Sequence, residues 1–139
     1  ALMYFSRMGL APDSIVRYYR GAEAEFIDPR TYGSMLEVTH THLAMMALLG
    51  LLLTHLAIFL PWPMRWRVVL IVLTFGSALA GEASGWLVRF VSPAWAPLKL
   101  ASFITLEGCL AVLLVGLAVF LMRPPAPLSV GAGGDTPTD

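Results

Sequence analysis

Six histidine and glutamate side chains lie inside largely apolar stretches, and their chemistry is the most informative feature of the sequence. They are three histidines and three glutamates, namely His40, His42, His55, Glu37, Glu82 and Glu107. Because placing an ionisable group in hydrocarbon costs free energy, each such residue is a functional candidate by default. Imidazole can ligate a metal, and imidazole and carboxylate can both accept protons. The pattern predicts a ligand-binding, redox or proton-transfer site, and hydrogen bonding between helices is the structural alternative.

Three apolar stretches hold these residues, and each is long enough to cross a bilayer as a helix of about 20 residues. They cover about residues 35–60, 68–91 and 98–122. Prolines follow the first and third stretches, and proline ends a helix because it lacks the backbone donor. The links 61–67 and 92–97 are short, so successive helices must run antiparallel. We therefore predict an all-α polytopic membrane protein with three transmembrane helices in an up-down arrangement.

The composition agrees with this fold class. Of the 139 residues, 58% are hydrophobic and 13% are charged, whereas about a quarter of a soluble domain is charged. Nine basic and nine acidic residues cancel, which leaves no basic stripe for nucleic acid. The single cysteine, Cys109, excludes an internal disulfide and a cysteine-based metal cluster. We expect a multi-pass protein of a bacterial inner (cytoplasmic) membrane.

The chain divides into three predicted segments. Residues 1–34 form an amphipathic extramembrane segment, residues 35–123 the three-helix domain, and residues 124–139 a disordered tail rich in Pro, Gly and Thr. In the first segment, Asp13 is the predicted N-cap of a surface helix that reaches Arg20 and ends near Gly21. At residues 1–5 we expect either the end of a fourth, truncated helix or an apolar foot in the interface.

The antiparallel order places most of the candidate residues at one depth. We call side A the membrane side that carries residues 1–34 and the link 92–97, and side B the opposite side. All the candidates except His55 then fall in the side-A half, so three helices contribute to one polar layer. Such a layer suits a quinone head group, because Glu37, Glu82 and Glu107 could accept quinol protons there.

The basic residues do not fix the orientation of the chain in the membrane. Beyond residue 10, side A carries five of them and side B three, but acidic residues dilute the side-A set. The side-A residues are Arg17, Arg20, Arg30, Arg89 and Lys99, and the side-B residues are Arg65, Arg67 and Arg123.

His40 and His55 have a spacing that carries a family resemblance. They lie about 60° apart around the helix and about 22 Å apart along it, with the small residues Ala44 and Ala47 between them. This helix resembles that of the membrane cytochromes b, in which one helix presents two histidines about four turns apart to two stacked haems. The resemblance covers His40-x14-His55 alone. It implies that His40 and His55 are axial iron ligands of a side-A and a side-B haem b.

The chain departs from that family pattern in one respect. A bis-histidine haem needs ligands from both sides of the ring, and all three histidines lie on one helix. A second ligand would have to come from a partner subunit, a symmetry mate, or Met45 or Met46. The same imidazoles, His42 included, could instead hold the magnesium of a chlorophyll-type pigment, which needs one protein ligand. His42 alone could equally be a hydrogen-bonded or headgroup-facing side chain.

Other metal sites have less support. Glu37 and His40 form an i, i+3 pair of the kind found in di-iron bundles, but those sites need two such pairs and two further carboxylates. A mononuclear site from His40, Glu82 and Glu107 is the remaining option.

Small residues recur every four positions in the second span. Ser77, Gly81 and Gly85 form a small-xxx-small stripe, which lets helices approach closely in lipid. It could face the first span, a partner subunit or a cofactor ring.

Two functions fit these observations. The first is a small membrane subunit of a bacterial-type respiratory or photosynthetic electron-transfer complex that binds haem b or a quinone. The alternative is a non-catalytic assembly subunit that packs against larger membrane partners and lipid. Because no catalytic motif is present, the chain is more typical of a subunit of an oxidoreductase complex than of an enzyme acting alone.

Overall fold

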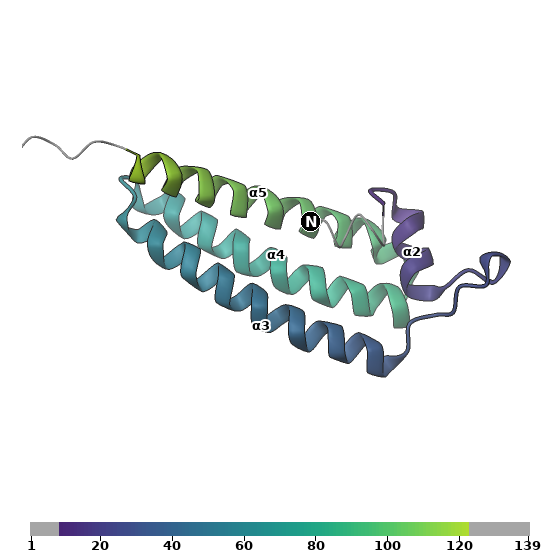
Figure 1. Ribbon diagram of the computed structural model, residues 1–139. Helices are drawn as coiled ribbons and strands as arrows, with labels where there is room; N and C mark the ends of the chain where they lie inside the picture. The colour runs from purple at the N-terminus through teal and green to yellow at the C-terminus, as the bar shows by residue number, and fades with distance from the viewer. Residues whose placement is uncertain (1–8, 123–139) are drawn as a thin grey trace, which may run out of the picture.

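The computed structural model describes residues 9–122, which form only helices and the segments that connect them. Figure 1 shows three long helices, α3, α4 and α5, running alongside one another, with the short helix α2 across one end. This confirms the predicted all-α antiparallel fold. The elements in order are α2 (Pro12–Arg20), η1 (Glu23–Glu25), α3 (Tyr32–Leu56), η2 (Ala57–Phe59), α4 (Met64–Phe90), η3 (Pro93–Trp95) and α5 (Ala96–Leu121). The predicted tail 124–139 and the expected foot or fourth helix at residues 1–5 lie outside the described residues.

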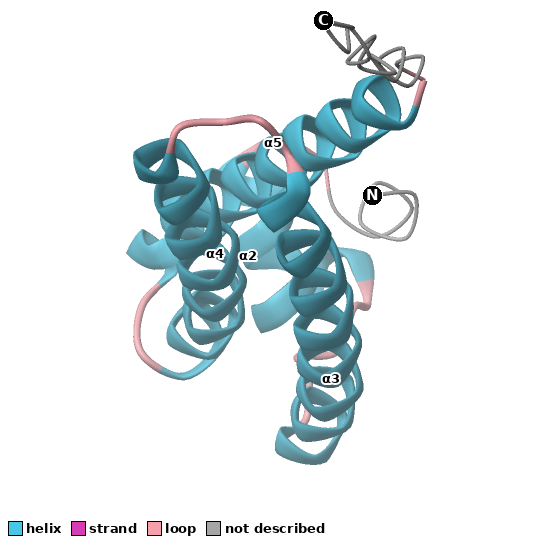
Figure 2. Cartoon of the chain, turned by 90° about the vertical axis from the view of Figure 1, so that its left-hand side faces the viewer, coloured by secondary structure: helices cyan, strands magenta, loops and turns pink. Residues whose placement is uncertain are grey.

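All three long helices can span a bilayer. The apolar helical segments Tyr32–Phe59, Met64–Phe90 and Pro93–Leu121 contain 28, 27 and 29 residues. At 1.5 Å per residue they measure about 40–44 Å, against a hydrocarbon core of about 30 Å. Each end therefore extends about 5–7 Å beyond the core. Seen along the bundle in Figure 2, the three helices lie at the corners of a triangle, and α4 packs most extensively against α5.

The ends of α3 and α4 differ by a few residues from the prediction. Thr31 Oγ1 accepts a hydrogen bond from Ser34 N at 3.2 Å and caps α3, which begins three residues early. α4 begins at Met64, so Arg67 belongs to its first turn rather than to the link. Arg67 Nη1 donates to the carbonyl of Ile58 at 2.8 Å. That carbonyl lies at the end of the first span, where backbone acceptors lack helical partners.

The surface helix α2 is present, but Asp13 does not cap it. The N-cap is Ala11, without a side-chain hydrogen bond, and Pro12 opens the helix. Proline suits that position because its missing N–H would have no partner there. Asp13 lies in the first turn, where the helix dipole favours a carboxylate. The helix ends before Gly21, as predicted, with φ of 79° at that glycine.

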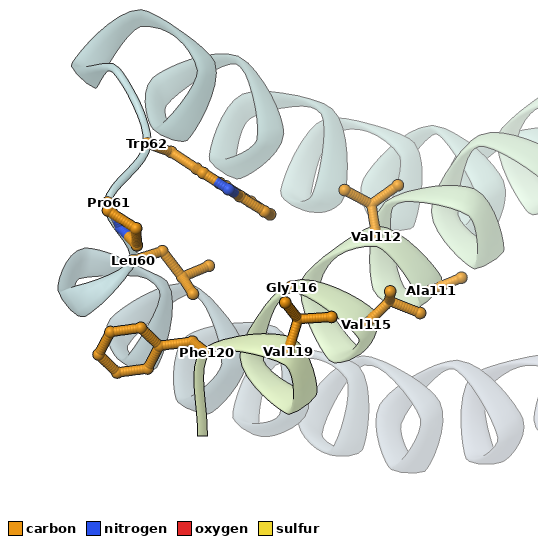
Figure 3. Close-up of a pocket in the computed structure, with 9 residues that line it drawn as sticks. All are labelled: Leu60, Pro61, Trp62, Ala111, Val112, Val115, Gly116, Val119 and Phe120. Atoms are coloured by element: carbon orange, nitrogen blue, oxygen red, sulfur yellow. The ribbon is translucent and has the colours of Figure 1, made fainter. Parts of the chain in front are cut away.

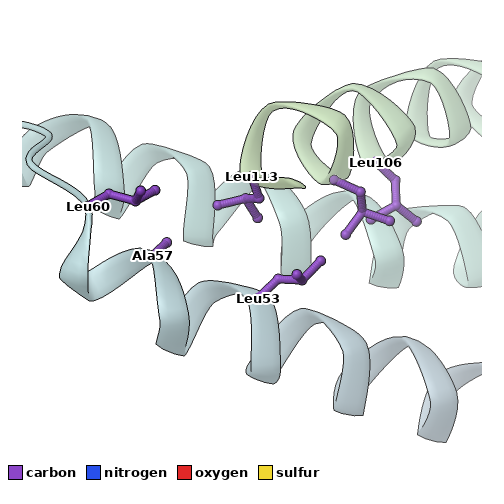
Figure 4. Packing of buried hydrophobic residues seen from close by; sticks show 6 residues of the cluster. Leu53, Ala57, Leu60, Leu106 and Leu113 are labelled. Carbon is purple, nitrogen blue, oxygen red and sulfur yellow. The ribbon is translucent and has the colours of Figure 1, made fainter. Parts of the chain in front are cut away.

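Two apolar clusters pack the bundle. One, near side A, joins α2 to the long helices and contains Ile15, Tyr19, Met35, Val88 and Ala96. The other, toward side B, contains Leu53, Ala57, Leu60, Leu106, Leu110 and Leu113, and Figure 4 shows these side chains meeting between α3 and α5. The predicted polar layer lies between these two clusters, in the side-A half of the bundle.

The small-residue stripe of α4 faces α5 and α2. A Cβ at Gly81 would lie 3.6 Å from Ser102 Cβ, and a Cβ at Gly85 would lie 2.9 Å from Tyr19 Oη. The two glycines therefore let α5 and the surface helix approach the α4 backbone. The sequence left open whether the stripe faces the first span, a partner subunit or a cofactor ring; in the structure Gly81 approaches α5 and Gly85 approaches α2.

Candidate polar site between α3 and α4

Glu82 of α4 is hydrogen-bonded to two side chains of α3. Its Oε1 lies 2.7 Å from His42 Nδ1, and its Oε2 accepts from Thr39 Oγ1 at 3.2 Å. The Glu82 side chain is 16% exposed, whereas that of His42 is 52% exposed. A carboxylate in the apolar layer is thus hydrogen-bonded to another helix, which was the structural alternative for these residues. We call Glu82, His42, Thr39 and Trp86 the Glu82 cluster.

Helical spacing brings the four residues together. Thr39 and His42 are three residues apart, and Glu82 and Trp86 are four apart, so each pair shares one face of its helix. Trp86 Nε1 donates to Thr39 Oγ1 at 3.0 Å. The Trp86 ring is held by stacking on Phe90, with centroids 5.6 Å apart. A continuous chain of hydrogen bonds therefore runs from Trp86 through Thr39 and Glu82 to His42.

Lys99 of α5 brings a positive charge close to this cluster. Its side chain is buried, and Nζ donates to the carbonyl of Gly81 at 2.7 Å. Nζ also lies 5.9 Å from the centroid of the Tyr19 ring. The ammonium is near enough to the Glu82 carboxylate for the two charges to attract. Lys99 thus offsets the charge of Glu82 in a layer that water does not reach freely.

The hydrogen bond to Glu82 sets the orientation and tautomer of His42. An ionised carboxylate can only accept, so the ring proton lies on Nδ1 and Nε2 carries the lone pair. Among the described residues, Nε2 has no hydrogen-bond partner, and the ring is half exposed. Carboxylates orient imidazoles in this way in metal ligands and in general bases. His42 Nε2 can therefore bind a metal or accept a proton from a hydroxyl.

The other candidates do not join the cluster. His40, His55 and Glu37 are exposed on α3, and Glu107 is half buried on α5. His40 lies about 160° from His42 around the helix, which turns it away from α4. The His55 ring meets Phe59 edge-on, with centroids 6.4 Å apart. Of the predicted side-A layer, the structure thus brings together Glu82 and His42, and it leaves Glu37 and His40 exposed on α3.

A metal site built from protein ligands alone is not assembled. Between residues 9 and 122, no three His, Cys, Asp or Glu side chains gather closely enough to hold an ion. The mononuclear site considered for His40, Glu82 and Glu107 is therefore wrong for this structure. The imidazoles of His40 and His55 are exposed on α3.

Three members of the site were missed or undervalued in the sequence. Lys99 was counted only as a side-A charge, although it lies inside the third apolar stretch, and that position was the available signal. Thr39 and Trp86 are not ionisable, so an ionisable group within an apolar stretch, the signal that identified the other candidates, does not single them out. Their roles depend on the rotation of α3 and α4 about their axes, which no local pattern indicates.

A separate hollow lies at the side-B end of the bundle. It is an apolar groove of about 460 Å³, and Figure 3 shows the Trp62 ring extending toward α5 along it. A Cβ at Gly116 would lie 2.5 Å from that ring. No ionisable side chain lines the groove, so it has no chemistry of its own. Its lining residues are Leu60, Pro61, Trp62, Ala111, Val112, Val115, Gly116, Val119 and Phe120.

Three apolar spans around an internal polar cluster define a multi-pass membrane protein. The chain belongs to the Aq_1264_TM family of transmembrane helical domains, whose sequence profile matches residues 9–128. No characterised protein and no solved structure matches it. The family match covers all three spans and the Glu82 cluster, and it lends no support to the resemblance to cytochromes b.

Proposed function

We propose that this chain is a small membrane subunit of an electron-transfer complex of a bacterial inner membrane, and that the Glu82 cluster binds a quinol head group. The observation that carries the proposal is the 2.7 Å pair of His42 Nδ1 and Glu82 Oε1. That pair leaves Nε2 of a half-exposed ring directed away from the carboxylate. A quinol hydroxyl is a donor of suitable chemistry for that nitrogen.

The depth of His42 suits a lipid-soluble ligand. His42 is ten residues from the start of α3 at Tyr32, about 15 Å along the helix axis. With about 6 Å of the helix outside the hydrocarbon core, the imidazole lies about 9 Å below the side-A boundary. A quinol whose tail lies among the acyl chains can reach this depth from the bilayer. Glu37, near the same boundary, is a candidate for passing protons onward to water.

The chemistry required of the chain is proton acceptance. Oxidation of a quinol to a quinone releases two protons and two electrons, and the electrons pass to a one-electron acceptor, such as a haem, in a neighbouring subunit. His42 Nε2 accepts the first proton, and the Glu82 carboxylate stabilises the imidazolium that forms. Thr39 and Trp86 hold Glu82 in place through the bonds described above. Glu107, half buried on α5, is a second candidate acceptor.

His40 and His55 support a further part of the proposal. Both imidazoles are exposed on α3, where each could supply one axial ligand of a haem b, or the single ligand of a chlorophyll-type pigment. The described residues do not supply an opposing imidazole, so this chain alone does not fit a bis-histidine haem. The second ligand would have to come from a partner subunit.

The decisive variant is His42→Asn in the complex purified through a tag on this chain. Asparagine Nδ2 takes the place of His42 Nδ1, so the bond to Glu82 is kept while the proton acceptor is lost. We expect oxidation of a short-tailed quinol such as decylubiquinol to slow by about 10²-fold or more, the contribution typical of a general base. Leu36→Asn is the matched control, because Leu36 is exposed on α3 and lies about 120° from His42 around the helix, away from Glu82.

The outcomes separate the two functions considered for the sequence. If His42→Asn and Glu82→Gln both leave quinol oxidation and complex assembly unchanged, the quinol site is wrong. If turnover is unchanged but the complex dissociates in either variant, the chain is an assembly subunit. A reduced-minus-oxidised absorption spectrum of the same preparations tests the haem. A b-type signal that persists in the His40→Ala, His55→Ala double variant would exclude these residues as ligands.

A further inference from the structure

The apolar groove at the side-B end of the bundle runs along α5. Six of its lining residues come from that helix, at positions i, i+1, i+4, i+5, i+8 and i+9, which form one strip along the helix axis. They are Ala111, Val112, Val115, Gly116, Val119 and Phe120. The first and last of them are about 13 Å apart along the axis, and the Trp62 ring extends toward the strip (Figure 3). The groove therefore follows the direction that acyl chains take in a bilayer.

The groove begins in the headgroup layer and continues into the hydrocarbon core. Phe120, at its outer end, is one residue before the end of α5 at Leu121. The third span extends about 7 Å beyond the core on side B, so Phe120 lies about 5 Å outside the core boundary. Ala111, at the inner end, then lies about 8 Å inside that boundary. The groove thus passes from the depth of the lipid ester groups to the depth of the acyl chains, as a phospholipid molecule does.

The lining of the groove suits an acyl chain. No ionisable residue lines it, and Val112, Val115 and Val119 are 48%, 63% and 45% exposed. The Trp62 ring lies over Gly116, where a Cβ would be 2.5 Å from the ring. Such a surface offers an acyl chain dispersion contacts with the valines and the indole, whereas it offers water few hydrogen bonds. Acyl chains, which surround the bundle at this depth, are therefore its expected occupant.

Two arginines bring positive charge to the side-B end beside the groove. The second wall of the groove consists of residues 60–62, and Arg65 and Arg67 follow it in the first turn of α4. Arg67 Nη1 donates to the carbonyl of Ile58, just before that wall, at 2.8 Å. The guanidinium of Arg67 is therefore held at the side-B boundary, and Arg65 is exposed there.

The charge of these arginines is uncompensated. At the side-A end four carboxylates offset the basic residues, namely those of Asp13, Glu23, Glu25 and Asp28. At the side-B end, within residues 9–122, there is no Asp or Glu. Guanidinium groups present a fork of donors that matches the oxygens of a phosphate. Each arginine near a bilayer surface favours anionic lipid by about five-fold, so this end of the bundle is complementary to a headgroup with net negative charge.

We propose that the groove binds one acyl chain of an anionic phospholipid, whose phosphate lies against Arg65 and Arg67. The depth and apolar lining of the groove select the acyl chain, and the two arginines select the headgroup. A zwitterionic phospholipid can place a chain in the same groove, but its cationic group is repelled by the arginines. The site lies at the opposite end of the bundle from the Glu82 cluster, so it does not depend on the proposed quinol site.

The test uses quenching of Trp62 fluorescence by brominated lipid in vesicles. Trp66→Phe, Trp86→Phe and Trp95→Phe leave Trp62 as the only tryptophan of the full chain, which is reconstituted in phosphatidylcholine. Phosphatidylglycerol or phosphatidylcholine with brominated acyl chains then replaces the unlabelled lipid in increasing mole fraction. Half-maximal quenching should need about five-fold less phosphatidylglycerol than phosphatidylcholine, or lower still. A chain that keeps Trp95 alone, at the side-A end, should be quenched equally by both lipids.

Variants separate the headgroup contact from the groove. The Arg65→Gln, Arg67→Gln double variant should be quenched equally by the two lipids, because glutamine at position 67 keeps a donor for the Ile58 carbonyl without the charge. Ala111→Phe fills the inner end of the groove and should weaken quenching of Trp62 by both lipids. Ala101→Phe, exposed on α5 outside the groove, is its matched control and should have no effect. Circular dichroism checks that each variant keeps its helical content.

Four results would each overturn the proposal. They are equal quenching of Trp62 by the two lipids in the chain with both arginines, a preference for phosphatidylglycerol that survives the double variant, equal effects of Ala111→Phe and Ala101→Phe, and no quenching of Trp62 by either lipid. The last result would mean that acyl chains do not enter the groove.

Discussion

The pairing of His42 with Glu82 can be measured as a coupling free energy. The perturbation is a double-mutant cycle with His42→Ala, Glu82→Leu and the double variant. Hydrogen bonds between transmembrane helices average about 0.6 kcal/mol and reach about 1.7 kcal/mol. A short bond to a carboxylate belongs at the strong end of that range, although the half-exposed ring of His42 weakens it. We therefore expect a coupling of about 1–1.5 kcal/mol.

The assay is unfolding of the purified chain by sodium dodecyl sulfate in mixed micelles, followed by circular dichroism. Trp86 fluorescence provides a local probe, because its indole is hydrogen-bonded to Thr39 within the same cluster. The control cycle replaces His42→Ala with His40→Ala. His40 is exposed and makes no contact with Glu82, so its cost should add to that of Glu82→Leu within about 0.5 kcal/mol. A His42–Glu82 coupling no larger than the His40–Glu82 value would refute the arrangement of the cluster.

Two further predictions concern close approaches to glycine. Gly85→Ala should lower the free energy of unfolding by about 1–3 kcal/mol, because the added Cβ would lie 2.9 Å from Tyr19 Oη. Gly76→Ala is the control, because its added Cβ would have no atom within 4 Å. We expect it to change the free energy of unfolding by less than about 0.5 kcal/mol. Equal effects of the two in the same detergent titration would contradict the docking of α2. Gly116→Ala should cost a similar amount because of the Trp62 ring, and that cost should disappear in a Trp62→Ala background. Additive costs in that pair would mean that Trp62 does not cover Gly116.

The spans could be predicted from the sequence, whereas the rotation of each helix could not. Length and composition suffice to identify three membrane helices, and antiparallel order fixes the depth of each residue. Rotation about the axis is normally indicated by an apolar stripe, but α3 is apolar nearly all the way round in its central turns. The sequence therefore does not show which of Glu37, His40 and His42 points toward α4. Only the packing of α3 on α4 distinguishes His42 from the other two.

Two other features depend on contacts between distant segments. Lys99 was counted only as a side-A charge, because the sequence does not show which way its side chain points from the third span. In the structure α5 packs on α4 so that the Lys99 ammonium reaches the carbonyl of Gly81. The contact of Gly85 with Tyr19 requires α2 to fold back over the side-A end. No pattern within α2 or α4 alone specifies that contact.

The identity of residue 42 bears on whether the Glu82 cluster only holds α3 and α4 together. Interhelical adhesion requires one donor to Glu82 from this position, which the hydroxyl of a serine or threonine could supply without exposing a second polar atom. Histidine supplies that donor and also places an acceptor, Nε2, on a ring that is half exposed. An unpaired acceptor in hydrocarbon carries a free-energy penalty that a purely structural contact does not need. We therefore propose that the imidazole at this position serves a ligand that donates a hydrogen bond to Nε2, while the bonds among Glu82, Thr39 and Trp86 provide the adhesion.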